Sequence, residues 1–460
     1  MDQEQLLEWL DRHHVDVVRT QVTTLDGPSI GKYLNRGKFL KSLPAGHNIS
    51  DMALAMDITG TPHLTFWHDF RSPTFGDIQV VPDLNTLQTD GRDPNLGHCI
   101  GDFSKKDGTP ISICPRTFLK KMTGLLETRG LSAKTAFELE FMMFKESFEE
   151  AREKKYQNLT PLGASRDSNI YLLKNAYHFK PFMDKVIENL NWRGIAWEAW
   201  NDENESGQIE LNLEPADPIT AADNVIRVKQ ILYETAVDMG LSLTFMPKMN
   251  RRLPTGMHIH HSLSKNGEPA FYSNTSADSR SELLYQWLGG LMACLPASVS
   301  FLCPNINSYR RMVDFAAPPT RAVWGEENKS AAFRLIGHSP QMARIEHRLP
   351  SSDVNPYLAS GIILASGLYG LDNQLSPPPE FHRIAWSATS EQAEKLPNTI
   401  SMSADRLEQD HRLEEIVGKD FIRYWIESRR LEWVNFQTES GDPYGADVTD
   451  WELNRYFELV

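Results

Sequence analysis

Polar and apolar residues alternate strictly over residues 136–141, which have the sequence AFELEF. Side chains in a β-strand point alternately to its two faces, so the pattern predicts a strand with Phe137, Leu139 and Phe141 on one face. Glu138 and Glu140 would share the other face, where their charges repel each other unless water or a cation lies between them. The stretch is therefore compatible with two structures, a solvated edge strand or a cation-binding strand.

Three later stretches, 208–214, 257–262 and 344–348, show the same alternation. Taken singly, each has an ordinary explanation: a wet sheet face, a structural histidine pair, or a surface ion-pair ladder of little energetic value. A single curled sheet whose polar faces meet in a charged cavity explains all four stretches together. The polar positions on these three strands include Glu210, Asn212, His258, His260, Ser262, Arg344, Glu346 and Arg348.

The pattern also divides the chain into two expected domains, residues 1–106 and 107–460. The first begins with an amphipathic helix and continues with a strand over 15–22 and turns rich in Gly, Pro and Asp. In the second, helices alternate with the polar-faced strands. Helices are expected over 116–129, 221–239 and 421–433, and irregular segments over 144–170 and 377–397.

The composition argues against several classes of protein. The 460 residues carry a net charge of −14, which disfavours nucleic acid or an anionic membrane as the main partner. The four cysteines lack metal-type spacing and are too few for a disulfide scaffold, so a reducing, cytoplasmic location is expected. The chain shows no signal-peptide pattern at its start and no apolar run of about 18 residues, so no membrane span is expected.

Metal-ligand residue types concentrate on the polar-faced strands. Oxygen-rich sets without thiolates suit Mg²⁺ or Mn²⁺, and this many carboxylates indicates two or more ions. Neighbouring arginines suit carboxylate and phosphate groups, so the combination indicates phosphoryl transfer from ATP. No Walker-type glycine loop is present, so ATP must be held by another fold. The residues predict a metal-dependent, ATP-using enzyme with a carboxylate or amine co-substrate, and the ligand set is Glu138, Glu140, Glu203, Glu210, Glu346 and His258.

Five motifs, in this order and spacing, resemble the glutamine synthetase family over nearly the whole chain. They are ENESGQIE at 203–210, FMPK at 245–248, TGMHIHHS at 255–262, NSYRR at 307–311 and NPYL at 355–358. The resemblance implies an α+β fold, with an N-terminal β-grasp domain and a catalytic domain. In the catalytic domain a curled, mainly antiparallel sheet would form a two-ended funnel, which ATP and glutamate enter from opposite ends. It also implies a homo-oligomer of two stacked hexameric rings, with active sites between adjacent subunits.

The resemblance further implies a role for each matched position. Asp57 would bind the amine from the neighbouring subunit, although a turn or cap aspartate is the alternative at this position. Arg311 and Arg348 would bind glutamate. His260, Ser262, Arg334 and Arg344 would lie on the nucleotide side. The metal nearer glutamate would be held by Glu140, Glu203 and Glu210, and the metal that bridges the phosphates by Glu138, His258 and Glu346.

The chain departs from the family pattern at several positions. Ala316 replaces a flap glutamate that helps to hold and deprotonate ammonium, and Phe315 precedes it. Ile58 makes the turn beside Asp57 less polar. Lys329, a candidate catalytic residue with Asp57 and Arg334, replaces an arginine and so keeps the charge but loses the bidentate geometry. Leu-Pro at 253–254 replaces an Asn-Gly pair that helps to seat glutamate. Together these changes favour the γ-glutamylamide synthetase branch, with an amine pocket formed by Ile58, Phe315 and Ala316.

The branch implies an ATP-dependent ligase that joins the γ-carboxylate of glutamate to an organic amine through γ-glutamyl phosphate. The apolar replacements favour an alkyl or aromatic monoamine such as isopropylamine or aniline. Glu326 and Glu327 keep a polyamine open as an alternative. An ammonium-using glutamine synthetase is a second alternative. A non-catalytic relative is a third, and it would be expected to have lost metal ligands, whereas all six positions keep them.

Overall fold

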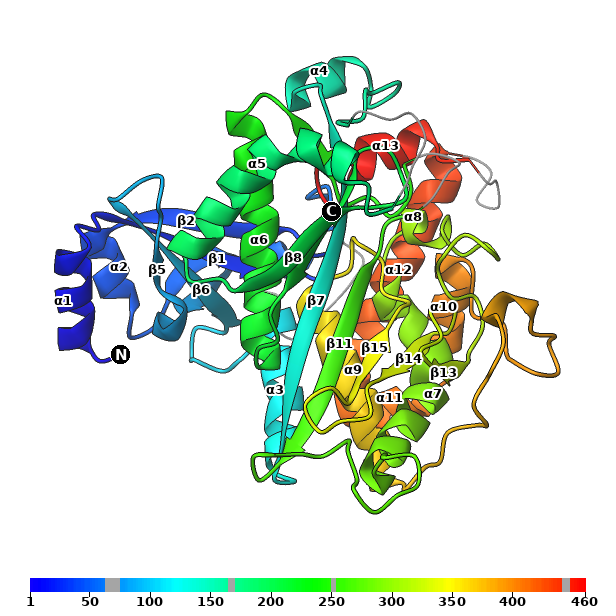
Figure 1. Cartoon of the computed structure of the whole chain (residues 1–460). Coiled ribbons are helices and arrows are strands. Elements are labelled where there is room, and N and C mark those ends of the chain that lie inside the picture. Colours follow the sequence, from blue (N-terminus) through cyan, green and yellow to red (C-terminus); the bar gives the residue numbers. More distant parts are fainter. Residues whose placement is uncertain (63–74, 164–169, 250–253, 441–446) are drawn as a thin grey trace.

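The computed structural model describes residues 1–62, 75–163, 170–249, 254–440 and 447–460. Its named strands form two sheets, a six-stranded sheet in the N-terminal part and a nine-stranded sheet in the rest of the chain (Figure 1). Helices pack around the larger sheet, so the protein is a mixed α+β structure, as the sequence predicts.

The N-terminal sheet has the strand order β2-β1-β6-β4-β3, with β5 paired to β6. β1 runs antiparallel to β2 and parallel to β6. Gly27, with φ of +105°, allows the tight turn between β1 and β2 that the Asp-Gly-Pro sequence predicts. The elements of this part are α1 (Gln3–Arg12), β1 (Val17–Thr23), β2 (Ser29–Asn35), α2 (Arg36–Ser42), β3 (His47–Ser50), β4 (Asp77–Pro82), β5 (Gln88–Thr89) and β6 (Leu96–Ser104).

The larger sheet has the order β13-β14-β15-β11-β7-β9-β8, with β10 paired to β7 and β12 to β11. Every pairing is antiparallel except β13 with β14, and the sheet curls. The four strands predicted from their alternation are adjacent in it, as β15-β11-β7-β9. The strands are β7 (Leu131–Phe144), β8 (Trp197–Asp202), β9 (Gln208–Leu213), β10 (Ser242–Thr244), β11 (Met257–Lys265), β12 (Glu268–Pro269), β13 (Trp324–Glu326), β14 (Phe333–Ile336) and β15 (Arg344–His347).

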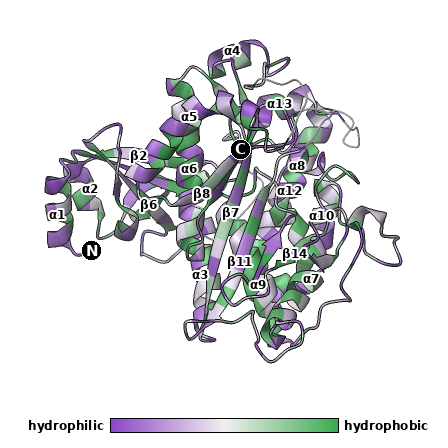
Figure 2. Ribbon diagram, in the orientation of Figure 1, coloured by the Kyte–Doolittle hydropathy of each residue, from purple (hydrophilic) through white to green (hydrophobic). Residues whose placement is uncertain are grey.

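The helices of this part include all three that the sequence predicts, as α3, α6 and α12. α9, which is largely hydrophobic in Figure 2, packs against α7 and α3. The segment 144–170 was expected to be irregular, and this is wrong for α4, because Ser147 and Glu150 form a capping box that starts a helix there. The helices are α3 (Pro115–Glu127), α4 (Phe148–Glu153), α5 (Leu173–Trp192), α6 (Pro218–Asp238), α7 (Glu282–Leu302), α8 (Ile306–Tyr309), α9 (Pro356–Asp372), α10 (Ile400–Glu408), α11 (His411–Val417), α12 (Lys419–Glu439) and α13 (Asp450–Tyr456).

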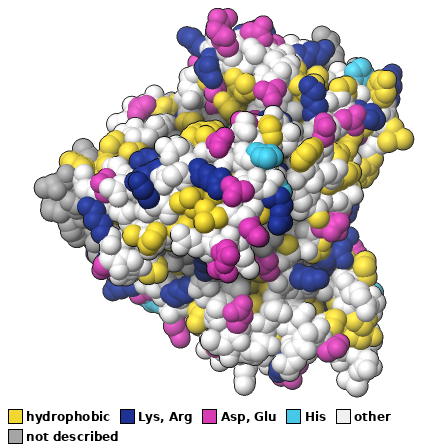
Figure 3. All heavy atoms as spheres, turned by 90° about the vertical axis from the view of Figure 1, so that its left-hand side faces the viewer, with side chains coloured by type: hydrophobic (Ala, Val, Ile, Leu, Met, Phe, Trp, Pro, Cys, Tyr) yellow, Lys and Arg dark blue, Asp and Glu magenta, His cyan; other side chains and the backbone are white. Residues whose placement is uncertain are grey.

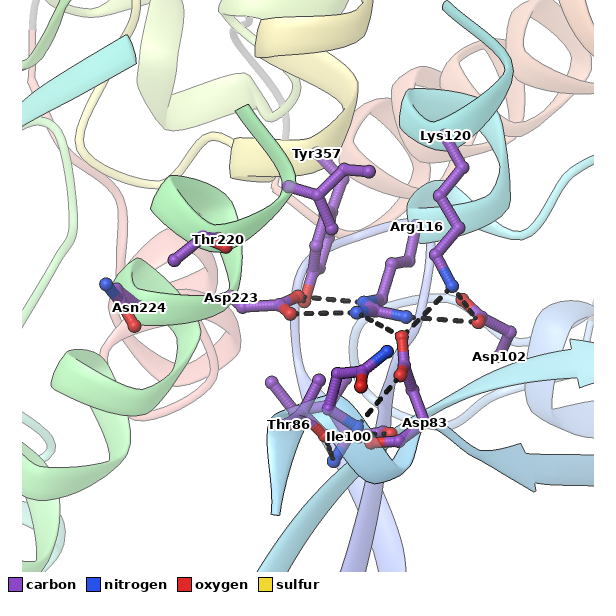
Figure 4. Close-up of polar contacts among 12 residues, drawn as sticks. Asp83, Thr86, Ile100, Asp102, Arg116, Lys120, Thr220, Asp223, Asn224 and Tyr357 are labelled. Atoms are coloured by element: carbon purple, nitrogen blue, oxygen red, sulfur yellow. Dashed lines mark hydrogen bonds and ion pairs between the residues drawn. The ribbon is translucent and has the colours of Figure 1, made fainter. Parts of the chain in front are cut away.

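A cluster of charged residues, here called the junction cluster, joins the N-terminal sheet to the helices of the larger part (Figure 4). Arg116 on α3 binds Asp223 on α6 through two nitrogens, at 2.8 and 2.9 Å. The same guanidinium binds Asp83 at 2.9 Å and Asp102 of β6 at 3.0 Å. Lys120 binds Asp102 at 2.6 Å, so the cluster ties together residues that are far apart in the sequence.

Apolar packing also crosses the junction. One cluster of buried side chains contains Ile78 and Phe103 of the N-terminal sheet together with Phe118 of α3 and Leu139 of β7. The opposite side of the N-terminal sheet packs against α1 and α2 in a separate small cluster around Leu10 and Phe39. The N-terminal sheet therefore shares its main core with the larger part. The boundary at residues 106 and 107 stays a prediction.

The face that carries the N-terminal sheet has basic and acidic side chains interspersed over its described surface (Figure 3). Such a mixture gives no extended field of one sign that would attract a polyanion. Among the helices of the described ranges, none has the length and apolar character needed to cross a bilayer.

Candidate active site

The register of the larger sheet brings the predicted carboxylates and histidines together. Glu138 of β7 lies opposite His258 of β11, and Glu140 lies opposite Glu210 of β9. The apolar alternate residues, among them Leu139, are buried on the other face. Period-two alternation therefore separates a core-facing row from a polar row on each strand, as predicted.

The polar row continues across β15 and β14. His260 lies opposite Glu346, and Glu346 lies opposite Arg334. Arg334 Nη1 donates to Glu346 Oε2 at 3.0 Å, and Arg348 also binds this carboxylate. Glu346 is 1% exposed, and the two guanidinium groups stabilise its buried charge.

A cavity of about 240 Å³ lies over this polar face. All six predicted metal ligands border it, from Glu138 on β7 to Glu346 on β15. Four of the predicted basic residues border it as well. One cavity therefore brings together the residues predicted to bind the metal ions, glutamate and the phosphates. Its walls are formed by Glu138, Glu140, Ile170, Tyr171, Glu203, Asn204, Gln208, Glu210, Pro254, Thr255, Gly256, His258, Arg311, Ala317, Pro318, Lys329, Arg334, Glu346 and Arg348.

Three of the carboxylates resist ionisation. Burial, together with repulsion from the other carboxylates, raises the pKa of Glu210 to about 9 and that of Glu140 to about 8. The pKa of Glu203 is raised for the same reasons. A site in which several acids face one another at this depth is stable with all of them ionised only when a cation lies among them.

Glu138 behaves differently from its neighbours. Burial opposes its ionisation, but hydrogen bonds with His258 at 3.0 Å and His260 at 2.9 Å outweigh burial and hold its pKa well below the usual range. Ligand atoms lie within 4.8 Å of one another in two groups, Glu138 with Glu210 and His258, and Glu138 with His260 and Glu346. Carboxylate oxygens and imidazole nitrogens at this spacing fit divalent cations such as Mg²⁺ or Mn²⁺.

The two arginines predicted to bind glutamate each have an N–H donor that lacks a hydrogen-bond partner among the described residues. Arg311 is 2% exposed, and its Nη1 donates to the Leu349 carbonyl oxygen at 2.8 Å. Its Nε has no partner among the described residues, and the same holds for Nε of Arg348. Buried donors without partners in a cavity suit an anionic ligand that completes their hydrogen bonding.

Arg334, predicted to lie on the nucleotide side, borders the cavity, and the other residues with that prediction lie beside it. His260 reaches it through its hydrogen bond to Glu138, and Arg344 Nε is 3.3 Å from His260 Nδ1. Ser262 follows on the same face of β11, half-buried and opposite Lys134. The strand therefore carries His258, His260 and Ser262 in a row on one face, with the two histidines in the metal-ligand groups and Ser262 beyond them.

Two parts of the predicted amine pocket lie apart in this chain. Phe315 and Ala316 directly precede Ala317 and Pro318, which line the cavity. Phe315 is 69% exposed and its ring lies 5.6 Å from that of Trp386. Asp57 and Ile58 are buried elsewhere and do not border the cavity of their own chain. Leu253 lies outside the described residues.

Some cavity residues were missed by the sequence reasoning. Gln208 Nε2 donates to Glu140 Oε2 at 2.8 Å, and the Gly256 backbone N–H donates to the same oxygen at 2.9 Å. A Cβ atom at Gly256 would lie 3.3 Å from side-chain atoms of Arg311 and His258, so a larger residue would crowd these two groups. Tyr171, next to a segment without clear periodicity, also lines the cavity. Burial and the nearby carboxylates raise its pKa. Gln208 and Gly256 stood inside recognised motifs, whereas Tyr171 had no such signal.

Known proteins resemble this chain over most of its length. Residues 112–456 match the family model described as glutamine synthetase, catalytic domain. A glutamate–isopropylamine ligase from a Pseudomonas species is 28% identical over 458 residues, which covers 98% of this chain and 97% of the relative. A glutamine synthetase from Thermus thermophilus is 28% identical over 465 residues, which covers 98% of each chain.

The fold has a close match among solved structures. A GmaS/ADP complex superposes with a TM-score of 0.83 at 23% identity, covering 97% of this chain and 98% of that chain. The fold, the site and these matches define a carbon–nitrogen ligase. The chain belongs to the glutamine synthetase family.

Proposed function

We propose that this protein uses ATP to join the γ-carboxylate of glutamate to an organic amine. The observation that carries the proposal is the cavity, where paired carboxylates lie beside two arginines with unpartnered Nε donors. The relative named for isopropylamine supports an organic amine, and the equal identity to a glutamine synthetase means that overall similarity does not choose the amine. That choice rests on the residues around the amine.

The six carboxylate and histidine ligands would hold two or more divalent cations, Mg²⁺ or Mn²⁺. When bound, these ions would neutralise the facing carboxylates and the charge that develops on the transferred phosphoryl group. Arg311 and Arg348 would hold glutamate through their free donors. Arg334 and Lys329, which border the same cavity, would face the phosphates.

The reaction has two steps. An oxygen of the γ-carboxylate attacks the γ-phosphorus of ATP, and ADP leaves, which gives γ-glutamyl phosphate. The nitrogen of a neutral amine then attacks the carbonyl carbon, phosphate leaves, and the nitrogen gives up one proton to phosphate or water as the amide forms. An alkylamine is protonated at neutral pH, so it must lose a proton before attack, whereas aniline is already neutral.

We infer that the amine is an alkyl or aromatic monoamine, such as isopropylamine or aniline. Ala316 places a methyl group where a carboxylate would attract ammonium, and Ala317 and Pro318 beside it are apolar and line the cavity. The exposed ring of Phe315 lies next to Trp386 and adds apolar surface. A γ-glutamylpolyamine synthetase and an ammonium-using glutamine synthetase are the alternatives.

We further propose that Asp57 acts in the cavity of a neighbouring subunit. It does not border the cavity of its own chain, so in this proposal a second chain delivers it to the amine. Two surface features could contact a second chain and so support such an assembly. β8 is an edge strand, and the large side chains of Leu173 and Tyr177 on α5 are 84% and 74% exposed. Two stacked hexameric rings, the β-grasp character of the N-terminal sheet, the two-ended funnel and a cytoplasmic location remain parts of this proposal.

The test is ATP-dependent phosphate release with glutamate, Mg²⁺ and a panel of amines, with the products identified by mass. The panel holds ammonium, isopropylamine, ethanolamine, putrescine, spermine and aniline. We expect kcat/KM for one monoamine to exceed that for ammonium by about tenfold or more. Preference for ammonium would make the chain a glutamine synthetase, and preference for spermine or putrescine would support the polyamine alternative.

A pair of variants tests the role of Ala316 itself. Ala316→Glu restores the carboxylate and should shift the preference toward ammonium by about tenfold. Val313→Glu is the matched control, because it adds the same charge to the same loop at a residue that is 52% exposed and does not border the cavity. An equal shift in both variants would contradict a specific role for position 316.

A further inference from the structure

Asp57, the proposed amine-binding carboxylate, is held by two separate parts of the chain. Its Oδ1 accepts hydrogen bonds within its own turn, from the backbone N–H of Thr59 at 2.9 Å, the Thr59 hydroxyl at 2.7 Å and the backbone N–H of Thr61 at 2.9 Å. Its Oδ2 accepts from Arg455 Nη2 on α13 at 2.6 Å. The C-terminal helix thus reaches a carboxylate that lies 398 positions earlier in the sequence.

Arg455 is itself tightly fixed. Its Nε and Nη2 bind both oxygens of Glu432 on α12, at 2.8 and 2.6 Å. Its guanidinium also lies over the Trp451 ring, with 4.9 Å to the ring centroid. Tyr456 donates to Glu432 as well, and the side chains of Arg455 and Glu432 are only 10% and 5% exposed. A buried guanidinium with a bidentate partner and a stacked ring has little freedom to move.

The charges in this arrangement do not cancel. Asp57 and Glu432 carry two negative charges, and Arg455 carries one positive charge. Among the described residues, Oδ2 of Asp57 accepts a hydrogen bond from Arg455 alone, so Asp57 keeps acceptor capacity on an oxygen whose position is fixed. A carboxylate in this state can accept one more hydrogen bond from a cationic or neutral amine at a defined place.

We propose that Arg455 is a positioning residue for amine binding, which fixes the Asp57 carboxylate from the C-terminal helix. The inference rests on the proposed function, because it takes Asp57 as the group that meets the amine. Arg455 does not border the cavity that is proposed to hold glutamate and ATP. Its loss should therefore disturb the amine alone, and in the assembly it would act on the neighbouring subunit's reaction through Asp57.

The experiment compares steady-state kinetics of the full-length wild type and Arg455→Gln with the preferred amine of the wild type. We expect KM for the amine to rise about tenfold, with KM for glutamate and for ATP changed less than about twofold. Arg455→Lys keeps the charge and one donor, so it should recover part of the loss, to within about threefold of the wild-type KM. Equal changes in all three KM values, or no change for the amine, would overturn the proposal.

Two further variants separate positioning from folding. Arg455→Gln leaves Glu432 buried without its partner, so the double variant with Glu432→Gln removes both charges and should keep the amine defect in a folded protein. Arg152→Gln is the control for tethering of the C-terminal segment, because it breaks the Arg152–Glu458 pair without touching Asp57. An amine defect in Arg152→Gln as large as that in Arg455→Gln would show that general tethering, and not Arg455, is responsible.

Failure of the positioning role of Arg455 is distinguishable from failure of the proposed function. If the wild type uses only ammonium, the proposed organic amine is wrong. The positioning role is then tested by KM for ammonium in the same variants. If the wild type ligates an organic amine and Arg455→Gln matches it in every KM, the proposed function stands and the role of Arg455 does not.

Discussion

The junction cluster and the active-site cavity both bury several charges, but they are organised differently. At the junction, Arg116 lies among Asp83, Asp102 and Asp223, and every carboxylate has a cationic partner within 3.0 Å. In the cavity, Glu140 and Glu210 face each other, and among the described residues neither forms an ion pair with lysine or arginine. The first cluster is complete within the protein, whereas the second contains like charges that a bound cation would neutralise.

The difference teaches how buried charge can be assigned a role. Removing one member of a closed network lowers the stability of the fold, since the remaining buried charges lose their partner. An open network of like charges lowers the stability of the fold when no ligand is bound. It is retained where a cation or substrate supplies the missing partner. Substitutions in the two clusters should therefore have opposite effects on stability and activity.

The largest expected effect is on activity, from Glu210→Gln in the cavity. Losing one carboxylate ligand should weaken metal binding and lower the rate of amide formation about a thousandfold. The reason is that the metal ions would then neutralise less of the charge on the transferred phosphoryl group. The metal-free variant should be at least as stable as the wild type, since a repelling carboxylate is gone. Phosphate release and thermal unfolding with and without Mg²⁺ check both statements. A large fall in the thermal midpoint of the metal-free variant would contradict the comparison.

The next effect is on stability, from Arg116→Ala at the junction. It leaves Asp223 buried without its partner and should lower the free energy of unfolding by about 3–5 kcal/mol, measured by urea denaturation. The folded fraction should keep its KM values. Arg129→Ala is the matched control, because it breaks an exposed pair with Asp372 and should cost about 0–1 kcal/mol. Similar losses in the two variants would remove the distinction between a buried network and a surface pair.

The smallest effect is a pH dependence of the junction. Burial opposes ionisation of Asp83, but Arg116 and Lys120 outweigh it and lower its pKa. The folded protein therefore holds fewer protons than the unfolded chain in acid, and stability is present above about pH 4 and lost as the pH falls further through the lowered pKa. Urea denaturation between pH 7 and pH 3 measures the loss, and Asp83→Asn should flatten it. An unchanged slope in that variant would assign the acid sensitivity to other groups.

The sequence predicted the cavity far better than the junction, for a physical reason. Alternation along a strand fixes which side chains share a face, so Glu138, Glu140 and His258 could be placed together before their register was known. The partners of Arg116 come from a loop, a strand and a helix, and no local pattern links Asp83 to Asp223. The pairing of Asp57 with Arg455 was missed for the same reason.

Irregular segments were also harder to predict. Tyr171 lines the cavity from a stretch without periodicity, and α4 starts from a four-residue capping signal inside a charged segment that looked irregular. Helices with long amphipathic patterns, such as α6 and α12, were found because the pattern repeats over several turns. A short signal such as the capping box of α4 does not repeat along the chain. It therefore gives weaker evidence for a helix than a long amphipathic pattern does.

The shared core has a consequence for how the chain melts. Because Ile78 and Phe103 belong to the same apolar cluster as Phe118 and Leu139, separating the N-terminal sheet from the rest would expose that cluster to water. The two parts therefore gain a share of their hydrophobic free energy jointly, and heating should give one cooperative transition rather than two. A chain shortened at residue 106 would lose one wall of its core, so the N-terminal sheet belongs to the folding unit of the enzyme.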